Sequence, residues 1–228
     1  MNNNGKALIL FPKDSTTDFL EEIVAYLFQT VHSSLFDFIR IEPSDQSHKD
    51  AFEQIQNPIY NTVIFLGHGS SVSLAGARDG EYRKEKFISI TNFKVFKSKK
   101  LVLVSCESST LIKKGKIHGF EEAIGFGDLP TDWNDIQSAR EIEMFAYRGF
   151  TEQTIHDFRN CLVEIIKYSL SNFFNNSLSL EDLYSLIFLR INKRITKYFI
   201  ENREINLPLN SVLLQMKDET LFINNARI

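Results

Sequence analysis

The side chains best suited to chemistry are an imidazole and a thiol, each placed directly after a strongly apolar run. His68 lies in the segment VIFLGHGS, and Cys106 lies in the segment LVLVSCES. A thiol is a strong nucleophile only as its thiolate, and a neighbouring imidazole can take up the thiol proton and later protonate a leaving amine. These two residue types together are suited to acyl transfer at a peptide bond.

The elements that must position this pair are strands that alternate with helices. This alternation predicts an α/β fold with a mostly parallel sheet and helices on both faces. We expect strands over 6–11, 37–41, 61–66, 100–105 and 122–127, and helices over 16–31 and 46–56. Ligands gather at the carboxyl ends of parallel strands, so His68 and Cys106 would emerge at one edge of the sheet if their strands are neighbours.

The second half of the chain is richer in helical patterns. We expect helices over 136–148, 151–174 and 179–202, a terminal β-hairpin from strands 211–216 and 220–223, and a minor hairpin from 71–75 and 86–90. A length of 228 residues suits one well-buried domain, so residues 1–228 are predicted to form a single domain.

The residues beside the pair could complete a catalytic site. Gly67 and Gly69 would let the backbone approach a substrate closely. The N–H groups of Gly69 and Cys106 could form an oxyanion hole. A helix that begins after Cys106 would favour the thiolate through its dipole. The plainer alternative is a buried, inert cysteine and a polar histidine in a turn, and the residues alone leave both readings open.

These two segments resemble a known family. Gly67-His68-Gly69 after one apolar strand, followed by Ser105-Cys106-Glu107-Ser108 after another, is similar to the CHAT branch of the caspase-like cysteine peptidases, the superfamily that contains caspases, separase and gingipains. The resemblance covers residues 60–130. It implies a caspase-like fold and hydrolysis of peptide bonds in a protein or peptide substrate by Cys106, with His68 acting mainly on the leaving group. It implies no metal and no organic cofactor.

The resemblance leaves the substrate preference open. Val104 stands where caspases carry Gln and metacaspases carry Asp, so neither preference carries over. Glu107, Asp128 and Asp132 could supply negative charge to a pocket, which would favour a Lys or Arg side chain of the substrate. An apolar pocket built from Val104, Phe126 and Trp133 is the alternative.

Composition narrows the classes of partner. The net charge is −3, which gives no basic footprint for nucleic acid. No apolar run approaches the roughly 20 residues that span a bilayer, and the N-terminus lacks the pattern of a signal peptide. Two cysteines form no disulfide framework. We therefore expect a cytoplasmic protein with no direct nucleic-acid partner and no membrane association.

Two further expectations concern regulation. The lysines within residues 109–120 suggest a mobile or cleavable segment, and a regulatory protein partner in a defence or signalling setting would suit a chain of this kind. The alternative function is a catalytically silent caspase-like interaction module, which would keep the fold and use the helical second half to bind a partner.

Overall fold

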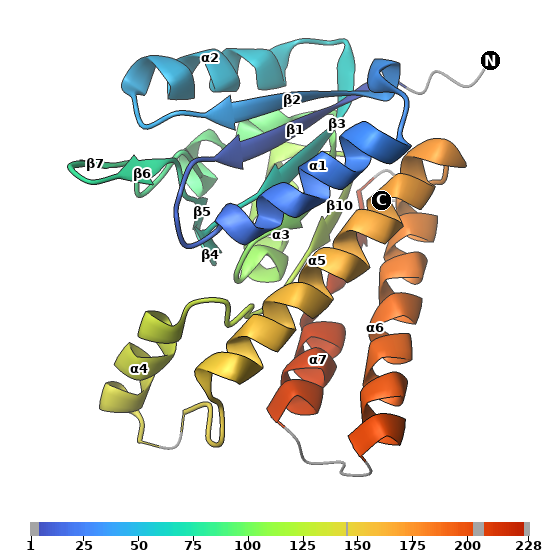
Figure 1. Ribbon diagram of the computed structural model, residues 1–228. Helices are drawn as coiled ribbons and strands as arrows, with labels where there is room; N and C mark the ends of the chain where they lie inside the picture. Colours follow the sequence, from blue (N-terminus) through green and yellow to red (C-terminus); the bar gives the residue numbers. More distant parts are fainter. Residues whose placement is uncertain (1–4, 145, 203–207, 226–228) are drawn as a thin grey trace.

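A six-stranded sheet forms the centre of the computed structural model, which describes residues 5–144, 146–202 and 208–225 (Figure 1). The strand order is β11-β10-β9-β3-β1-β2, and all neighbouring strands are parallel except β10 and β11. The strands are β1 (Lys6–Pro12), β2 (Phe36–Ile41), β3 (Tyr60–Leu66), β9 (Lys100–Val104), β10 (Glu122–Gly125) and β11 (Leu221–Asn224). The predicted α/β class with a mostly parallel sheet is confirmed.

Helices cover both faces of this sheet, as expected. Because side chains of a strand point alternately to its two faces, an apolar strand that is covered on both sides supplies two cores. One face packs against α1 (Glu21–Thr30), α5 (Glu152–Asn175), α6 (Leu180–Asn202) and α7 (Pro208–Glu219). The other packs against α2 (Asp45–Gln56), α3 (Ser108–Gly115) and the 3-10 segment η3 (Ile90–Phe96).

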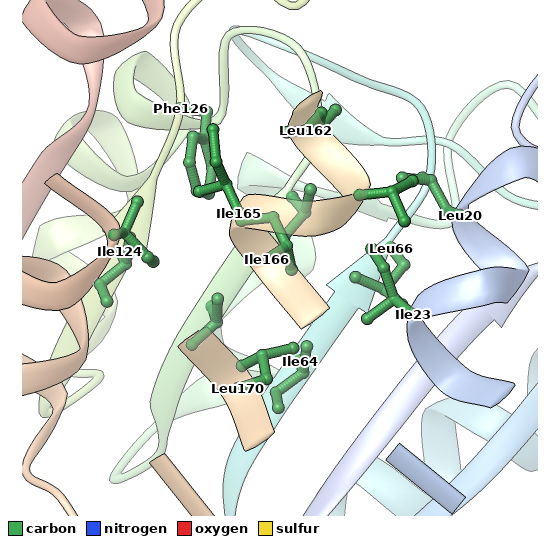
Figure 2. Packing of buried hydrophobic residues seen from close by; sticks show 14 of the residues in the cluster. Leu20, Ile23, Ile64, Leu66, Ile124, Phe126, Leu162, Ile165, Ile166 and Leu170 are labelled. Carbon is green, nitrogen blue, oxygen red and sulfur yellow. The ribbon is translucent and has the colours of Figure 1, made fainter. Parts of the chain in front are cut away.

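Helix α5 packs across one face of the sheet, against β3 and β9. In Figure 2, Ile166 and Leu170 of α5 face Ile64 and Leu66 of β3, and Ile165 lies near Phe126. All of these side chains are buried, and each fully buried aliphatic side chain contributes about 1.5–3 kcal/mol. This packing fixes the ends of the central strands against a rigid helix.

Short strands lie beside the carboxyl edge of the sheet. β4 (Gly69–Ser70), β5 (Ser73–Leu74) and β8 (Ile88–Ser89) form a small antiparallel sheet, and β6 (Arg78–Asp79) pairs with β7 (Tyr82–Arg83). Leu74 pairs with Ile88, so the segments 71–75 and 86–90 do pair, but the β6–β7 ribbon lies between them in the chain and they do not form a simple hairpin. Because β4 starts directly after His68, these strands border the candidate site.

The expected terminal hairpin is wrong in its first strand. Residues 211–216 belong to helix α7, and only the segment 220–223 gives a strand, β11, which pairs with β10 instead. A short apolar run does not distinguish a buried helix from a strand. Pro208 at the first position of α7 is a helix-start signal, because the fixed φ of proline suits that position.

The segment 109–120 is also different from its prediction. It forms most of α3, the short 3-10 helix η4 (Lys116–His118) and the start of the connection to β10, where a flexible loop was expected. Leu111 and Ile112 are fully buried in the core while Lys113 and Lys114 face solvent. The lysines are therefore the polar face of an amphipathic helix. Helix α4 (Trp133–Ile142) is shorter than the 136–148 expected and starts earlier.

Candidate active site

The register between two neighbouring parallel strands places His68 and Cys106 at the same edge of the sheet. Leu66 at the end of β3 pairs with Val104 at the end of β9, and Gly67 N donates to Val104 O over 3.2 Å. His68 and Cys106 each follow their paired residue by two positions. The two segments singled out in the sequence are thus adjacent where they leave the sheet.

The backbone of Gly69 lies against the turn that carries Cys106. A Cβ atom at Gly69 would lie 2.6 Å from Ser105 Oγ and 3.1 Å from Cys106 O, so a larger residue does not fit without movement. Ala75 N donates to His68 O over 3.0 Å, which makes Gly69 and Leu74 a non-hydrogen-bonded pair. The N–H of Gly69 therefore points away from β5.

The backbone N–H of Cys106 is the second group of the expected oxyanion hole. Within the described ranges it donates to no backbone or side-chain acceptor, whereas its neighbours Ser105 and Glu107 donate to Leu103 O and Gly127 O. Neither expected donor is therefore used in a sheet ladder, and the two residues follow the ends of the adjacent strands β3 and β9. A carbonyl oxygen bound between them would be polarised by both.

A polar cluster that the sequence did not reveal holds His68. Its Nε2 lies 2.6 Å from Thr16 Oγ1 and 3.6 Å from Asp14 Oδ2, both in the loop that follows β1. The imidazole is 25% exposed, whereas the Asp14 side chain is only 4% exposed. Because these contacts engage Nε2, the ring orientation is fixed and Nδ1 faces no hydrogen-bond partner in the described part of the chain.

Arg78 completes this cluster from the β6–β7 ribbon. Its Nε forms an ion pair with Asp14 Oδ2, and one terminal nitrogen donates to Thr16 Oγ1 over 2.8 Å. Burial alone would raise the pKa of Asp14, but hydrogen bonds from Thr16 and Arg78 and the charge of His68 outweigh it and lower that pKa. Asp14 is therefore an anion that faces the imidazole.

Burial lowers the pKa of His68, and the Arg78 charge adds to this effect while Asp14 opposes it. The imidazole is consequently neutral at neutral pH and can accept a proton. His68 also lines a pocket of about 330 Å³ together with Asp14, Gly69 and Asp135. A substrate can therefore reach the ring from solvent.

Cys106 is a neutral thiol in the free protein. Its Sγ donates to Leu129 O over 3.2 Å. Burial raises the pKa of the thiol to about 12, the charges of Asp128 and Asp135 add to this effect, and the hydrogen bond with Leu129 opposes it. Burial therefore opposes the thiolate, which a helix beginning after Cys106 was expected to favour. Asp135 also acts on the pKa of His68, so one carboxylate lies near both members of the pair.

Ser108, at the start of α3, holds the turn of Cys106 in place. Its fully buried hydroxyl contacts Leu103 O at 2.7 Å and accepts from Phe126 N over 2.8 Å. The side chain thus joins the ends of β9 and β10. The sequence motif contains this residue, but its type alone does not reveal the contacts.

Glu107 ties the same turn to the neighbouring small sheet. Its backbone has a φ of +52°, a left-handed conformation that is uncommon outside glycine. Its Oε2 accepts from Ser71 N over 2.8 Å, in the turn between β4 and β5. The turn that carries Cys106 and the strand that follows His68 are therefore held together by a side chain as well as by close backbone contact.

The three expected substrate-binding residues have different environments. Val104 is 1% exposed and packs in the core beneath α5, so its prediction as a pocket residue is wrong. Phe126 is equally buried, which removes two members of the alternative apolar pocket. Asp132 caps α4 by accepting from Asn134 N over 2.9 Å, and its charge acts on the pKa of His68.

Asp128 affects the pKa of the Cys106 thiol, whereas Asp132 does not contribute to that shift. The charge of Asp128 is the main one that raises the pKa of Cys106. Tyr147 Oη donates to Asp128 Oδ2, and burial raises the pKa of Asp128 itself, with Glu219 and Glu107 acting in the same direction. These three carboxylates line a pocket of about 400 Å³ together with Asp218 and Lys113.

Comparison with protein-family models and with curated proteins finds no match for this chain. Among the described residues, no group of three or more His, Cys, Asp or Glu side chains is placed to hold a metal ion. No helix in the same ranges is long and apolar enough to cross a membrane.

Proposed function

We propose that this protein is a caspase-like cysteine endopeptidase whose catalytic pair is His68 and Cys106. The observation that carries the proposal is the pairing of Leu66 with Val104 at the ends of two adjacent strands. His68 and Cys106 each lie two residues beyond this pair. The neutral imidazole, its buried carboxylate partner and the backbone N–H groups of Gly69 and Cys106 supply the other groups that acyl transfer requires.

The reaction begins when the scissile carbonyl oxygen binds to the two backbone N–H groups. The Cys106 proton passes to His68, and Sγ attacks the carbonyl carbon to give a tetrahedral intermediate. His68 then donates this proton to the amide nitrogen, the C–N bond breaks and the amine leaves. Water, deprotonated by the same imidazole, hydrolyses the remaining thioester and restores the thiol.

The high pKa of Cys106 indicates that substrate binding activates the nucleophile. A preformed thiolate–imidazolium pair is disfavoured, because burial penalises both charged forms. Substrate that displaces the thiol from Leu129 O would free the S–H bond for transfer to His68. The free enzyme is then largely protected from oxidation and from small alkylating agents.

The acidic pocket beside Cys106 favours a basic substrate side chain. Asp128, Glu107, Glu219 and Asp218 line it with one cation, Lys113, and a Lys or Arg side chain would neutralise more of the excess negative charge. We include this substrate class in the proposal, with a protein or peptide as the substrate and a protein partner as the regulator.

Digestion of a peptide library, followed by mass spectrometry, tests the proposed function. We expect cleavage mainly after Lys or Arg in the wild type and in Cys161→Ala, and no cleavage in Cys106→Ala. Cys161 is a matched control because it is the other free cysteine, is partly buried, and has a pKa that burial also raises. Asp128→Asn should reduce cleavage after basic residues more than after others.

A catalytically silent interaction module is the second candidate. The raised pKa of Cys106 and its contact with Leu129 O favour it, since both describe a thiol at rest. In that case wild type and Cys106→Ala would be equally inactive on every peptide and protein tested, with the fold of both intact by circular dichroism.

A further inference from the structure

A third pocket, lined by neither His68 nor Cys106, lies between α5 and α6. It has a volume of about 240 Å³ and is lined on α6 by Arg190, Lys193, Arg194 and Lys197. Residues at these spacings share one face of a helix. Glu164 and Tyr168 of α5 form the facing wall. Four cations and one carboxylate therefore line a single small pocket in a chain whose net charge is −3.

Only part of this positive charge is neutralised by the protein. Arg194 forms an ion pair with Glu164, and Lys197 lies 3.7 Å from Glu201. Among the described residues, Arg190 and Lys193 have no acidic partner within ion-pair distance. Like charges at these spacings on one helix face destabilise the helix, and a bound anion would offset the repulsion.

Arg190 gives the most specific evidence that the pocket binds an anion. Its Nε is buried and has no hydrogen-bond partner in the described part of the chain. The guanidinium lies over the ring of Tyr168, 5.2 Å from the centroid, and Lys167 lies 5.4 Å from the same centroid. A buried charged donor without an acceptor costs free energy, and an acceptor oxygen in the pocket would remove that cost.

We propose that this pocket binds the phosphate group of a small phosphorylated ligand. A phosphate carries close to two negative charges at neutral pH and presents three strong acceptor oxygens. Arg190 and Arg194 supply planar, multiple donors suited to such a group, and the two lysines add charge. A single carboxylate would offset less of this charge and offers fewer acceptors.

Calorimetric titration of the full chain with ATP and with inorganic pyrophosphate, at low ionic strength, tests the proposal. The variant Arg190→Gln/Lys193→Gln removes the two unpaired cations. Lys49→Gln/Lys114→Gln removes two exposed lysines elsewhere and is matched in charge. We expect the first variant to weaken binding by at least about tenfold, and the control by less than about twofold, because the lost hydrogen bonds are charge-assisted.

The two probes separate the sources of the phosphate. Tighter binding of ATP would indicate a nucleotide, and equal binding would indicate recognition of the phosphate groups alone; both support the site. The proposal is overturned if neither probe binds below millimolar concentration, or if both double variants bind like the wild type. Retained cooperative unfolding of each variant shows that a loss of binding does not reflect a loss of fold.

Discussion

His68 Nε2 lies 3.6 Å from the buried carboxylate of Asp14, although the two residues are far apart in the chain. The contact arises because β1 and β3 are parallel neighbours, so the loops after both strands meet at one edge. Thr16 and Arg78 hold the carboxylate in place. In the proposed peptidase, Asp14 positions the imidazole and stabilises its protonated form.

Asp14→Asn is therefore expected to lower kcat/KM by at least about tenfold. Because Asp14 raises the pKa of His68, its neutralisation should also move the acidic limb of the pH–rate profile to lower pH. Asp79→Asn is the control, because Asp79 is an exposed carboxylate of the nearby β6–β7 ribbon and forms an ion pair with Lys13. An unchanged pH profile in Asp14→Asn would contradict the positioning role.

The thiol should become reactive only at high pH in the absence of substrate. The pKa of Cys106 is about 12, so the rate of alkylation by iodoacetamide should still be rising at pH 10. The measurement uses Cys161→Ala, which leaves Cys106 as the one thiol in the chain, and follows the protein mass over time. A rate that reaches a plateau near neutral pH would instead show a preformed thiolate.

Gly69→Ala should impair catalysis while leaving most of the fold intact. The new Cβ would lie 2.6 Å from Ser105 Oγ and would displace either the Cys106 turn or the proposed oxyanion donor. We expect a loss of about tenfold or more in kcat, in the range seen when an oxyanion donor is misplaced. Ser71→Ala is the control, because only its backbone N–H contacts the turn. Equal kcat values for the two variants would argue against an oxyanion role for Gly69.

Ser108→Ala should destabilise the protein by about 1–3 kcal/mol, because it leaves the buried Phe126 N–H without its acceptor. Urea unfolding followed by circular dichroism measures this change. Thr110→Ala, two residues further along α3 at a partly exposed position, should change stability by less than about 0.5 kcal/mol. A similar small change for Ser108→Ala would show that the hydroxyl does not hold the strand ends together.

Much of the fold could be predicted from the sequence because the strands carry strong local signals. β3 contains the apolar run VIFL and β9 the apolar run LVLV, and His68 and Cys106 each lie two residues beyond the end of their strand. The same rule failed for residues 211–216, where the burial of Val212, Leu213 and Met216 follows the spacing of a helix. A run of six residues is too short for its period to separate the two structures.

The rest of the site depends on contacts that are distant in the chain. Asp14 and His68 meet because the sheet order places β1 beside β3, and Arg78 joins them because its backbone N–H donates to Lys13 O, just after β1. Asp14 could have been found by asking which polar residues follow the strand predicted next to β3. Val104 was misplaced because a strand residue two positions before the nucleophile can point into the core instead of toward solvent, as it does here.

The most direct test of the catalytic pair is the rate at which a peptidyl acyloxymethyl ketone, with Lys or Arg at its reactive end, labels the protein. The label should attach to Cys106 in the wild type and in Cys161→Ala at equal rates. It should be lost in Cys106→Ala and slowed at least about a hundredfold in His68→Ala, because the thiol needs the imidazole to lose its proton. Labelling of Cys106 that is as fast in His68→Ala as in the wild type would contradict the account.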